Sequence, residues 1–201
     1  MEDGKKTTSS SAGWRANQSR WQTGQQQNSF VDPDAEYRLI RPHLEFLDLP
    51  NRLRLHEPPE KLRFSYFPNH GLVSVVVATK GGRDVEAGVV GFEGVVGIAL
   101  AVGLDKSPLR EVVQLEGNAF RVAPRALQDT LLEAPDLQMR LSRYAVLQGM
   151  QVAQTAACNR LHEVAQRLAR WLLMAQDRVD TAILAITHDF LATCWVPTGQ
   201  A

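Results

Sequence analysis

The chain has 201 residues, 44% of them hydrophobic, and its 22 basic and 22 acidic side chains give a formal net charge of zero at pH 7. This length suffices for one or two cores, and no apolar run reaches the roughly 18 residues that a membrane span needs. The balanced charge argues against nonspecific nucleic-acid affinity and leaves specific binding open. The distant Cys158 and Cys194, without an N-terminal signal pattern, predict a cytoplasmic protein that has no disulfide framework.

Residues 1–35 are rich in Ser, Thr, Gln, Asn and Gly and contain few large apolar side chains. Such a segment buries too little apolar surface to offset the entropy lost on ordering, so we expect a disordered tail. Trp14 and Trp21 are candidates for a short partner-recognition motif, and two isolated aromatics without a function are the simpler interpretation.

Residues 36–134 are predicted to form an antiparallel β-roll with flanking helices. A helical period runs over 36–54. A glycine-rich stretch over 91–97 follows the strand expected over 84–90. A hairpin turn is expected at 80–83, and a second turn is expected at 116–117. Short strands with glycine corners and no long helices between them favour a roll or barrel. The expected strands are 62–67, 71–78, 84–90, 110–115 and 118–122.

The second half is predicted to be helical. Pro124 suits the first turn of a helix, and Ala134-Pro135 separates it from a long helix over 135–159. That helix carries two apolar stripes, and since one stripe suffices to cover its own domain, the second predicts a parallel homodimer seam. A helix enclosed within one monomer is the alternative. The first stripe contains Leu137, Leu141 and Tyr144 in register with Gln148 and Gln151, and the second contains Met139, Val146, Met150, Ala153 and Ala157 in register with Arg143.

Residues 160–201 are predicted to be the remnant of a DNA-binding lobe. They open with an amphipathic helix whose apolar face contains Leu161, Val164, Ala165, Leu168, Leu172 and Ala175. Residues 186–192 then look like the first helix of a helix-turn-helix, with Thr187 as N-cap and with Phe190 and Leu191 on one face. Pro197 interrupts the helical pattern soon after, and no second, DNA-reading helix is predicted. Sequence-specific binding is therefore expected to be weak or absent, with salt-sensitive phosphate contacts from Arg160, Arg167, Arg170 and Arg178.

Five segments, taken in order, resemble the Crp/Fnr family of bacterial transcription regulators. They are 66–68, 71–74, 89–97, 158–174 and 186–192, and the resemblance covers roughly residues 36–194. It implies the α+β class, with a cyclic-nucleotide-binding-like β-roll, a long dimerisation helix and a truncated helical DNA-binding lobe. It also implies a cytoplasmic homodimer that acts as a ligand-sensing regulator. The alternative function is a dimerisation or sensor module that binds no DNA and sequesters full-length partners.

The resemblance also places a ligand pocket at Gly97, Ile98, Ala99, Arg110 and Glu111. Family members that bind cyclic nucleotides carry Gly-Glu at the start of a short helix and an Arg followed by Ser or Thr. Here Ile98 cannot accept a ribose hydrogen bond, and Glu111 would oppose a phosphate if it faced inward. We therefore expect that the pocket binds no cyclic nucleotide and takes either an unidentified ligand or none. Arg110 is expected to pair with a nearby carboxylate.

Other chemistry is not indicated. The five histidines lack the paired spacing of a metal site, and the N-terminal tail offers no thiolate for an iron–sulfur cluster. No nucleophile–base spacing is present, and the 91–97 stretch lacks the lysine of a phosphate-binding loop. We expect neither a metal nor an enzyme. The histidines are His43, His56, His70, His162 and His188.

Overall fold

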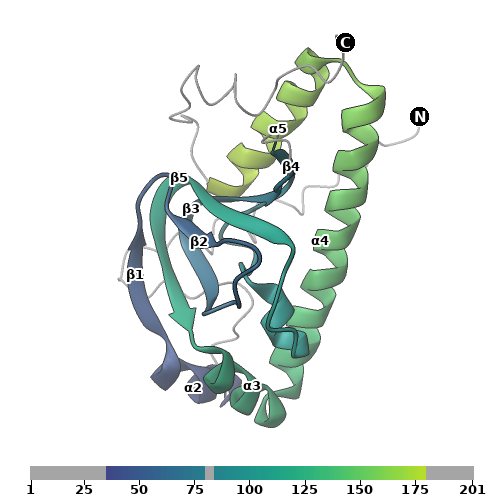
Figure 1. Ribbon diagram of the computed structural model, residues 1–201. Helices are drawn as coiled ribbons and strands as arrows, with labels where there is room; N and C mark the ends of the chain where they lie inside the picture. Colours follow the sequence, from purple (N-terminus) through teal and green to yellow (C-terminus); the bar gives the residue numbers. More distant parts are fainter. Residues whose placement is uncertain (1–34, 80–83, 180–201) are drawn as a thin grey trace, which may run out of the picture.

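The computed structural model describes residues 35–79 and 84–179. An antiparallel sheet with strand order β1-β5-β3-β4 forms its centre, and β2 pairs with β5 outside that path. Figure 1 shows α2 and α3 at one end of the sheet, the long α4 along its side and α5 folded back from the far end of α4. This is the predicted α+β arrangement. The elements are α2 Ala35–Ile40, η2 Arg41–His43, β1 Glu45–Leu49, β2 Arg54–His56, β3 Ser65–Val77, β4 Val85–Val90, η3 Ile98–Val102, β5 Leu109–Val122, α3 Pro124–Glu133, α4 Pro135–Leu161 and α5 Val164–Val179.

The two long central strands correct the predicted strand boundaries. The expected turn at 116–117 is wrong, because β5 continues through it as one strand, and β3 likewise joins the two segments predicted around residue 70. Gly117 instead lets the strands approach: a Cβ added there would lie 2.2 Å from the His70 carbonyl oxygen. Gly71, at φ +89°, would place a Cβ 2.6 Å from the Leu115 carbonyl oxygen. The pairing of β3 with β5 shifts register here. These two glycines therefore allow the backbones of the two strands to cross closely at a β-bulge.

The helix predicted over 36–54 is wrong beyond His43. The chain there forms β1 and β2, which both pair with β5. Leu49 is buried in the core, and the Phe46 ring meets the Phe120 ring edge-on at 5.6 Å between centroids. These pairings join residues 55 to 76 positions apart in the sequence, so a local periodicity could not predict them.

Several predicted boundaries are confirmed. The chain breaks at Ala134 between α3 and α4, and β3 pairs with β4 out to Val77 opposite Val85. The hairpin turn at 80–83 lies outside the described residues, as do the tail over 1–34 and the helix-turn-helix residues Thr187, Phe190 and Leu191. Across 35–79 and 84–179, no helix is both long and apolar enough to cross a membrane.

Two apolar clusters lie on opposite faces of the sheet. Val73, Val75 and Val113 point to the inner face, where they pack with η3 and with the first part of α4. Leu72 and Val89 belong to a smaller cluster on the outer face with Trp171 and Ala175 of α5. Neighbouring residues of a strand alternate between faces, so β3 contributes to both clusters. The sheet therefore carries the core on one side and α5 on the other.

Candidate functional site

The turn before η3 is fixed to the inner face of the sheet. Gly97 adopts φ +71°, and a Cβ added there would lie 2.8 Å from the Phe64 carbonyl oxygen, so this conformation favours glycine. Its N–H donates to Glu111 Oε1 at 3.0 Å, and its carbonyl oxygen accepts from Ser65 Oγ at 3.0 Å. Two of the predicted pocket residues, Gly97 and Glu111, are thus in direct contact.

Glu111 is a buried carboxyl without a cation partner. Only 6% of the residue is exposed, and its Oε2 atom has no hydrogen-bond partner. Burial raises the pKa of Glu111 to about 7, and the hydrogen bond from Gly97 opposes this shift. The N–H of Gly97, which would otherwise be available to a ligand oxygen, is occupied by this side chain. Ile98 and Ala99, also predicted for the pocket, begin η3 and pack partly buried against the core.

Tyr144 of α4 closes the same region from the helix side. Its ring is buried, and a Cβ added at Gly94 would lie 2.2 Å from the Tyr144 hydroxyl oxygen. Burial and the charge of Glu93 raise the pKa of Tyr144. The segment 94–97 is therefore held between β3, β5 and α4, which gives the core of the roll a direct connection to the long helix.

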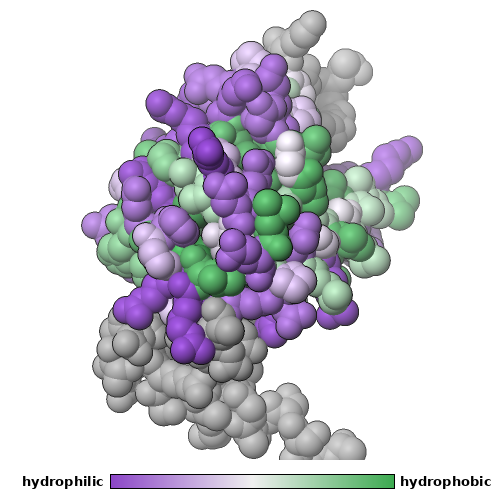
Figure 2. Space-filling model, turned by 90° about the horizontal axis from the view of Figure 1, so that it is seen from below, coloured by the Kyte–Doolittle hydropathy of each residue, from purple (hydrophilic) through white to green (hydrophobic). Residues whose placement is uncertain are grey.

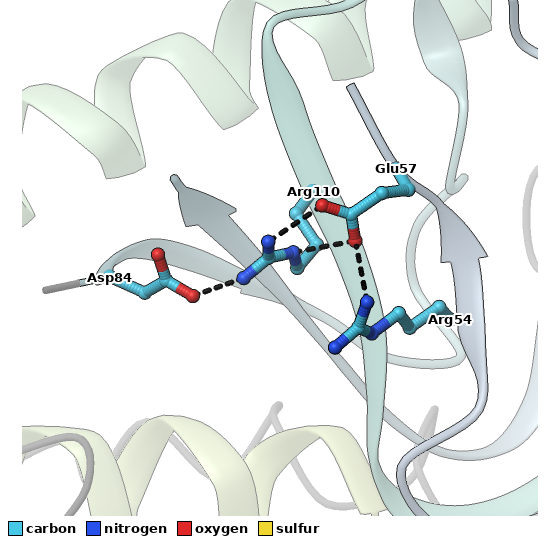
Figure 3. A network of polar contacts seen from close by, with 4 residues as sticks. All are labelled: Arg54, Glu57, Asp84 and Arg110. Carbon is cyan, nitrogen blue, oxygen red and sulfur yellow. Dashed lines mark hydrogen bonds and ion pairs between the residues drawn. The ribbon is translucent and has the colours of Figure 1, made fainter. Parts of the chain in front are cut away.

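Arg110 points to the other face of β5. It lies opposite Val76, whereas Glu111 lies opposite Val75, so the two side chains are separated by the sheet. The Arg110 guanidinium donates to both oxygens of Glu57 at 2.6 and 2.7 Å and also to Asp84. Arg54 completes the network shown in Figure 3, at 3.5 Å from Glu57.

This network neutralises Arg110. The hydrogen bond from Arg110 lowers the pKa of Glu57, and the same bond raises the pKa of Arg110. The expected pairing with a nearby carboxylate is therefore present. The structure brings Gly97, Ile98, Ala99 and Glu111 to one place and directs Arg110 away from it.

The two stripes of α4 differ in exposure. Leu137, Leu141 and Tyr144 are buried in the main hydrophobic cluster beneath the sheet. The second stripe is exposed, with Met139 at 51%, Val146 at 60% and Met150 at 63%, and Ala153 and Ala157 are exposed too. The sequence interpretation missed one further exposed leucine of this helix, Leu147, and assigned Leu161, which is exposed at the end of this helix, to the next one.

Polar residues of α4 follow the same division. Gln151 faces the sheet, where its Oε1 accepts the N–H of Val89 at 2.9 Å, and Arg143 is exposed in register with the second stripe. Figure 2, viewed from the end that carries α2 and α3, shows hydrophobic patches broken up by hydrophilic residues.

The apolar face of α5 is centred further along the helix than predicted. Trp171 and Ala175 are its buried residues, whereas Leu161, Val164 and Ala165 are exposed. The sequence interpretation also missed Ser74 and Glu86, which lie under Trp171 in two valine-rich strands. A polar residue inside such a β-branched run was the available signal.

Comparisons with known proteins bear on the fold. No protein-family model matches the sequence, and no curated protein matches it significantly. The c-di-GMP-responsive global regulator CLP of Xanthomonas campestris superposes with a TM-score of 0.64 at 16% identity, over 79% of this chain and 82% of that one. FixK2 from Bradyrhizobium japonicum gives 0.64 at 12% identity, over 76% and 77%.

A transcriptional regulator assigned to the Crp/Fnr family, from Eubacterium rectale, gives a TM-score of 0.65 at 12% identity, over 81% of this chain and 76% of that one. The chain has the fold of the Crp/Fnr regulators. Within this Crp/Fnr fold, the described residues contain no group of three or more His, Cys, Asp or Glu side chains that could hold a metal ion.

We expect that millimolar cAMP does not raise the melting temperature of the chain. Glu57 and Asp84 occupy the Arg110 guanidinium, and Glu111 occupies the Gly97 N–H. A ligand at about a hundred times its Kd would add about 2.7 kcal/mol to the free energy of unfolding, which a melting curve detects readily. A reproducible upward shift that Arg110→Ala abolishes would contradict this expectation.

Proposed function

We propose that the chain is a sensor-regulator of the Crp/Fnr type that dimerises through α4. In this proposal residues 36–134 form the sensor domain, 135–159 the dimerisation helix and 160–201 the part of the chain directed to DNA. The observation that carries it is the division of α4 into a face buried on its own domain and an exposed apolar stripe containing Val146 and Met150. A second copy of the same helix would cover that stripe, as two apolar helices do in a coiled coil.

The polar contacts of α4 support this choice of partner. Gln151 is engaged with β4, so it does not interrupt the exposed stripe. The stripe consists of medium-sized and small side chains, since Val146 and Met150 are followed by Ala153 and Ala157 at spacings of three and four residues. Such spacing keeps the residues on one side of a helix and lets two helices approach closely.

DNA is the proposed partner of the region that α5 leads into. Among the arginines expected to contact phosphates, Arg170 donates to Thr155 and Arg178 contacts Glu93. The prediction that this chain does not discriminate operators stays a prediction, since residues 180–201 lie outside the described part.

Val146→Glu should convert a dimer into a monomer at micromolar concentration. The substitution would place two carboxylates in an apolar seam, and burying each without a partner costs several kcal/mol. Sedimentation velocity measures the change, and Gln138→Glu is the matched control because it adds a carboxylate at an exposed position of the same helix that belongs to neither stripe. A wild-type chain that sediments as a monomer would contradict the proposed dimer.

Selection from a random-sequence DNA pool, at about 150 mM salt, tests the DNA part of the proposal. Enrichment of a palindromic site by the wild-type chain, lost in Val146→Glu, would support a regulator and overturn the prediction of weak discrimination. A dimer that enriches no site would favour the sequestering module. Sedimentation therefore tests whether the chain dimerises, and the DNA selection tests separately whether the dimer recognises a DNA sequence.

A further inference from the structure

The contact between α5 and the outer face of the sheet contains a polar group at its centre. Trp171 and Ala175 pack on Leu72 and Val89, which alone would make an ordinary apolar interface. Glu86 of β4 lies within it, and its Oε1 accepts the indole N–H of Trp171 at 2.7 Å. This side chain is the direct polar connection between β4 and the middle of α5.

The hydrogen bonds around Glu86 form a chain of neutral groups. Ser74 Oγ lies 2.6 Å from Glu86 Oε2 and 3.4 Å from Gln114 Oε1. If the carboxyl is neutral, its O–H donates to Ser74, and the Ser74 hydroxyl is free to donate to Gln114. If the carboxyl is ionised, Ser74 must turn its hydrogen to Glu86, and Gln114 Oε1 loses that donor. The neutral form therefore satisfies more of the hydrogen bonds in this partly buried chain.

The charged groups of the surrounding elements have other partners. Arg178 of α5 contacts Glu93, Arg170 of α5 donates to Thr155, and Arg110 of β5 binds Glu57 and Asp84. From α4, the neutral Gln151 approaches β4.

Arg167 lies one turn before Trp171 on α5. Burial raises the pKa of Glu86 to about 7, against the hydrogen bonds from Ser74 and Trp171.

We propose that the neutral form of Glu86 holds α5 on the sheet and that ionisation of Glu86 loosens this contact. Because β4 also receives Gln151 of α4, the contact lies beside the proposed dimerisation helix. The inference that this contact controls a DNA-binding lobe rests on the proposed function. The inference that Glu86 holds α5 on the sheet does not depend on it.

The test is hydrogen exchange of residues 164–179 by mass spectrometry in the full chain at pH 6 and pH 8, corrected for the pH dependence of chemical exchange. Protection of wild-type α5 should fall about tenfold from pH 6 to pH 8, because the docked state binds a proton that the undocked state releases. Glu86→Gln should keep high protection at both pH values. Its amide reproduces the neutral acid, with the NH2 group donating to Ser74 and the oxygen accepting from Trp171.

Glu111→Gln is the matched control, since Glu111 titrates in the same range on the opposite face of the sheet. This variant should retain the tenfold fall in α5. Glu93→Gln should lower α5 protection at both pH values by a similar factor, because it removes the partner of Arg178. Should Glu86→Gln fail to fold, Trp171→Phe retains an aromatic ring but lacks the indole N–H that donates to Glu86, and it should lower α5 protection at pH 6.

Three results would overturn the proposal: a wild-type α5 whose protection is the same at both pH values, a fall that persists in Glu86→Gln, or a fall that disappears in Glu111→Gln. Because the measurement needs no DNA, a chain that binds no DNA still gives a decisive result on α5.

Discussion

Glu111→Gln should raise the free energy of unfolding by about 3 kcal/mol at pH 8 and reduce the loss of stability between pH 5 and pH 8. The pKa of Glu111 is about 7 in the folded chain, against an ordinary value of 4.5. Each tenfold difference in proton affinity corresponds to about 1.4 kcal/mol. The folded state thus holds a proton that the unfolded state has already released, so the contribution to stability is complete below pH 4.5 and is lost as the pH rises through 7.

An amide has nearly the shape of a neutral carboxyl and does not ionise, so the Gln variant should not show this loss. Urea unfolding at several pH values measures the difference, and Glu116→Gln is the matched control because Glu116 is exposed on the same strand. Equal pH dependence in Glu111→Gln and the wild-type chain would show that Glu111 is already ionised in the folded state or is solvated.

Gly117→Ala should lower the free energy of unfolding by about 3 kcal/mol, because the added methyl group has no space. It would lie 2.2 Å from the His70 carbonyl oxygen and 2.6 Å from the Gly71 nitrogen. Both atoms belong to the backbone of β3, so relief requires the two longest strands to move apart where they cross. The midpoint of urea unfolding reports the loss.

Gly149→Ala on α4 is the control for the chemical change alone. A Cβ at Gly149 meets no atom within 4 Å. Alanine is the better helix former by about 1 kcal/mol, so this variant should be more stable than the wild-type chain. Comparable stability of Gly117→Ala and the wild-type chain would mean that the strand crossing is looser than the structure shows.

The sequence by itself determined the elements whose pattern is local and long. The two stripes of α4 repeat at helical spacing over most of the helix, and Ala134-Pro135 marks where it begins, so both could be predicted without tertiary information. The β-branched run over 71–78 and the β-roll architecture followed from the same kind of local pattern. Local sequence also predicted that Arg110, followed by Glu111, would pair with a carboxylate.

Tertiary structure alone decided the features that depend on distant strands. Leu44 and Leu47 fit a helical period, yet pairing of β1 with β5 makes the segment Glu45–Leu49 a strand. Gly117 is a residue type typical of turns, yet the close approach of the His70 backbone makes it the point where β3 and β5 cross. Glu86 and Glu111 are ordinary surface residue types whose chemistry changes because α5 covers one and the roll encloses the other. Burial and strand pairing arise from contacts between residues far apart in the chain, which is why local periodicity and residue type could not predict them.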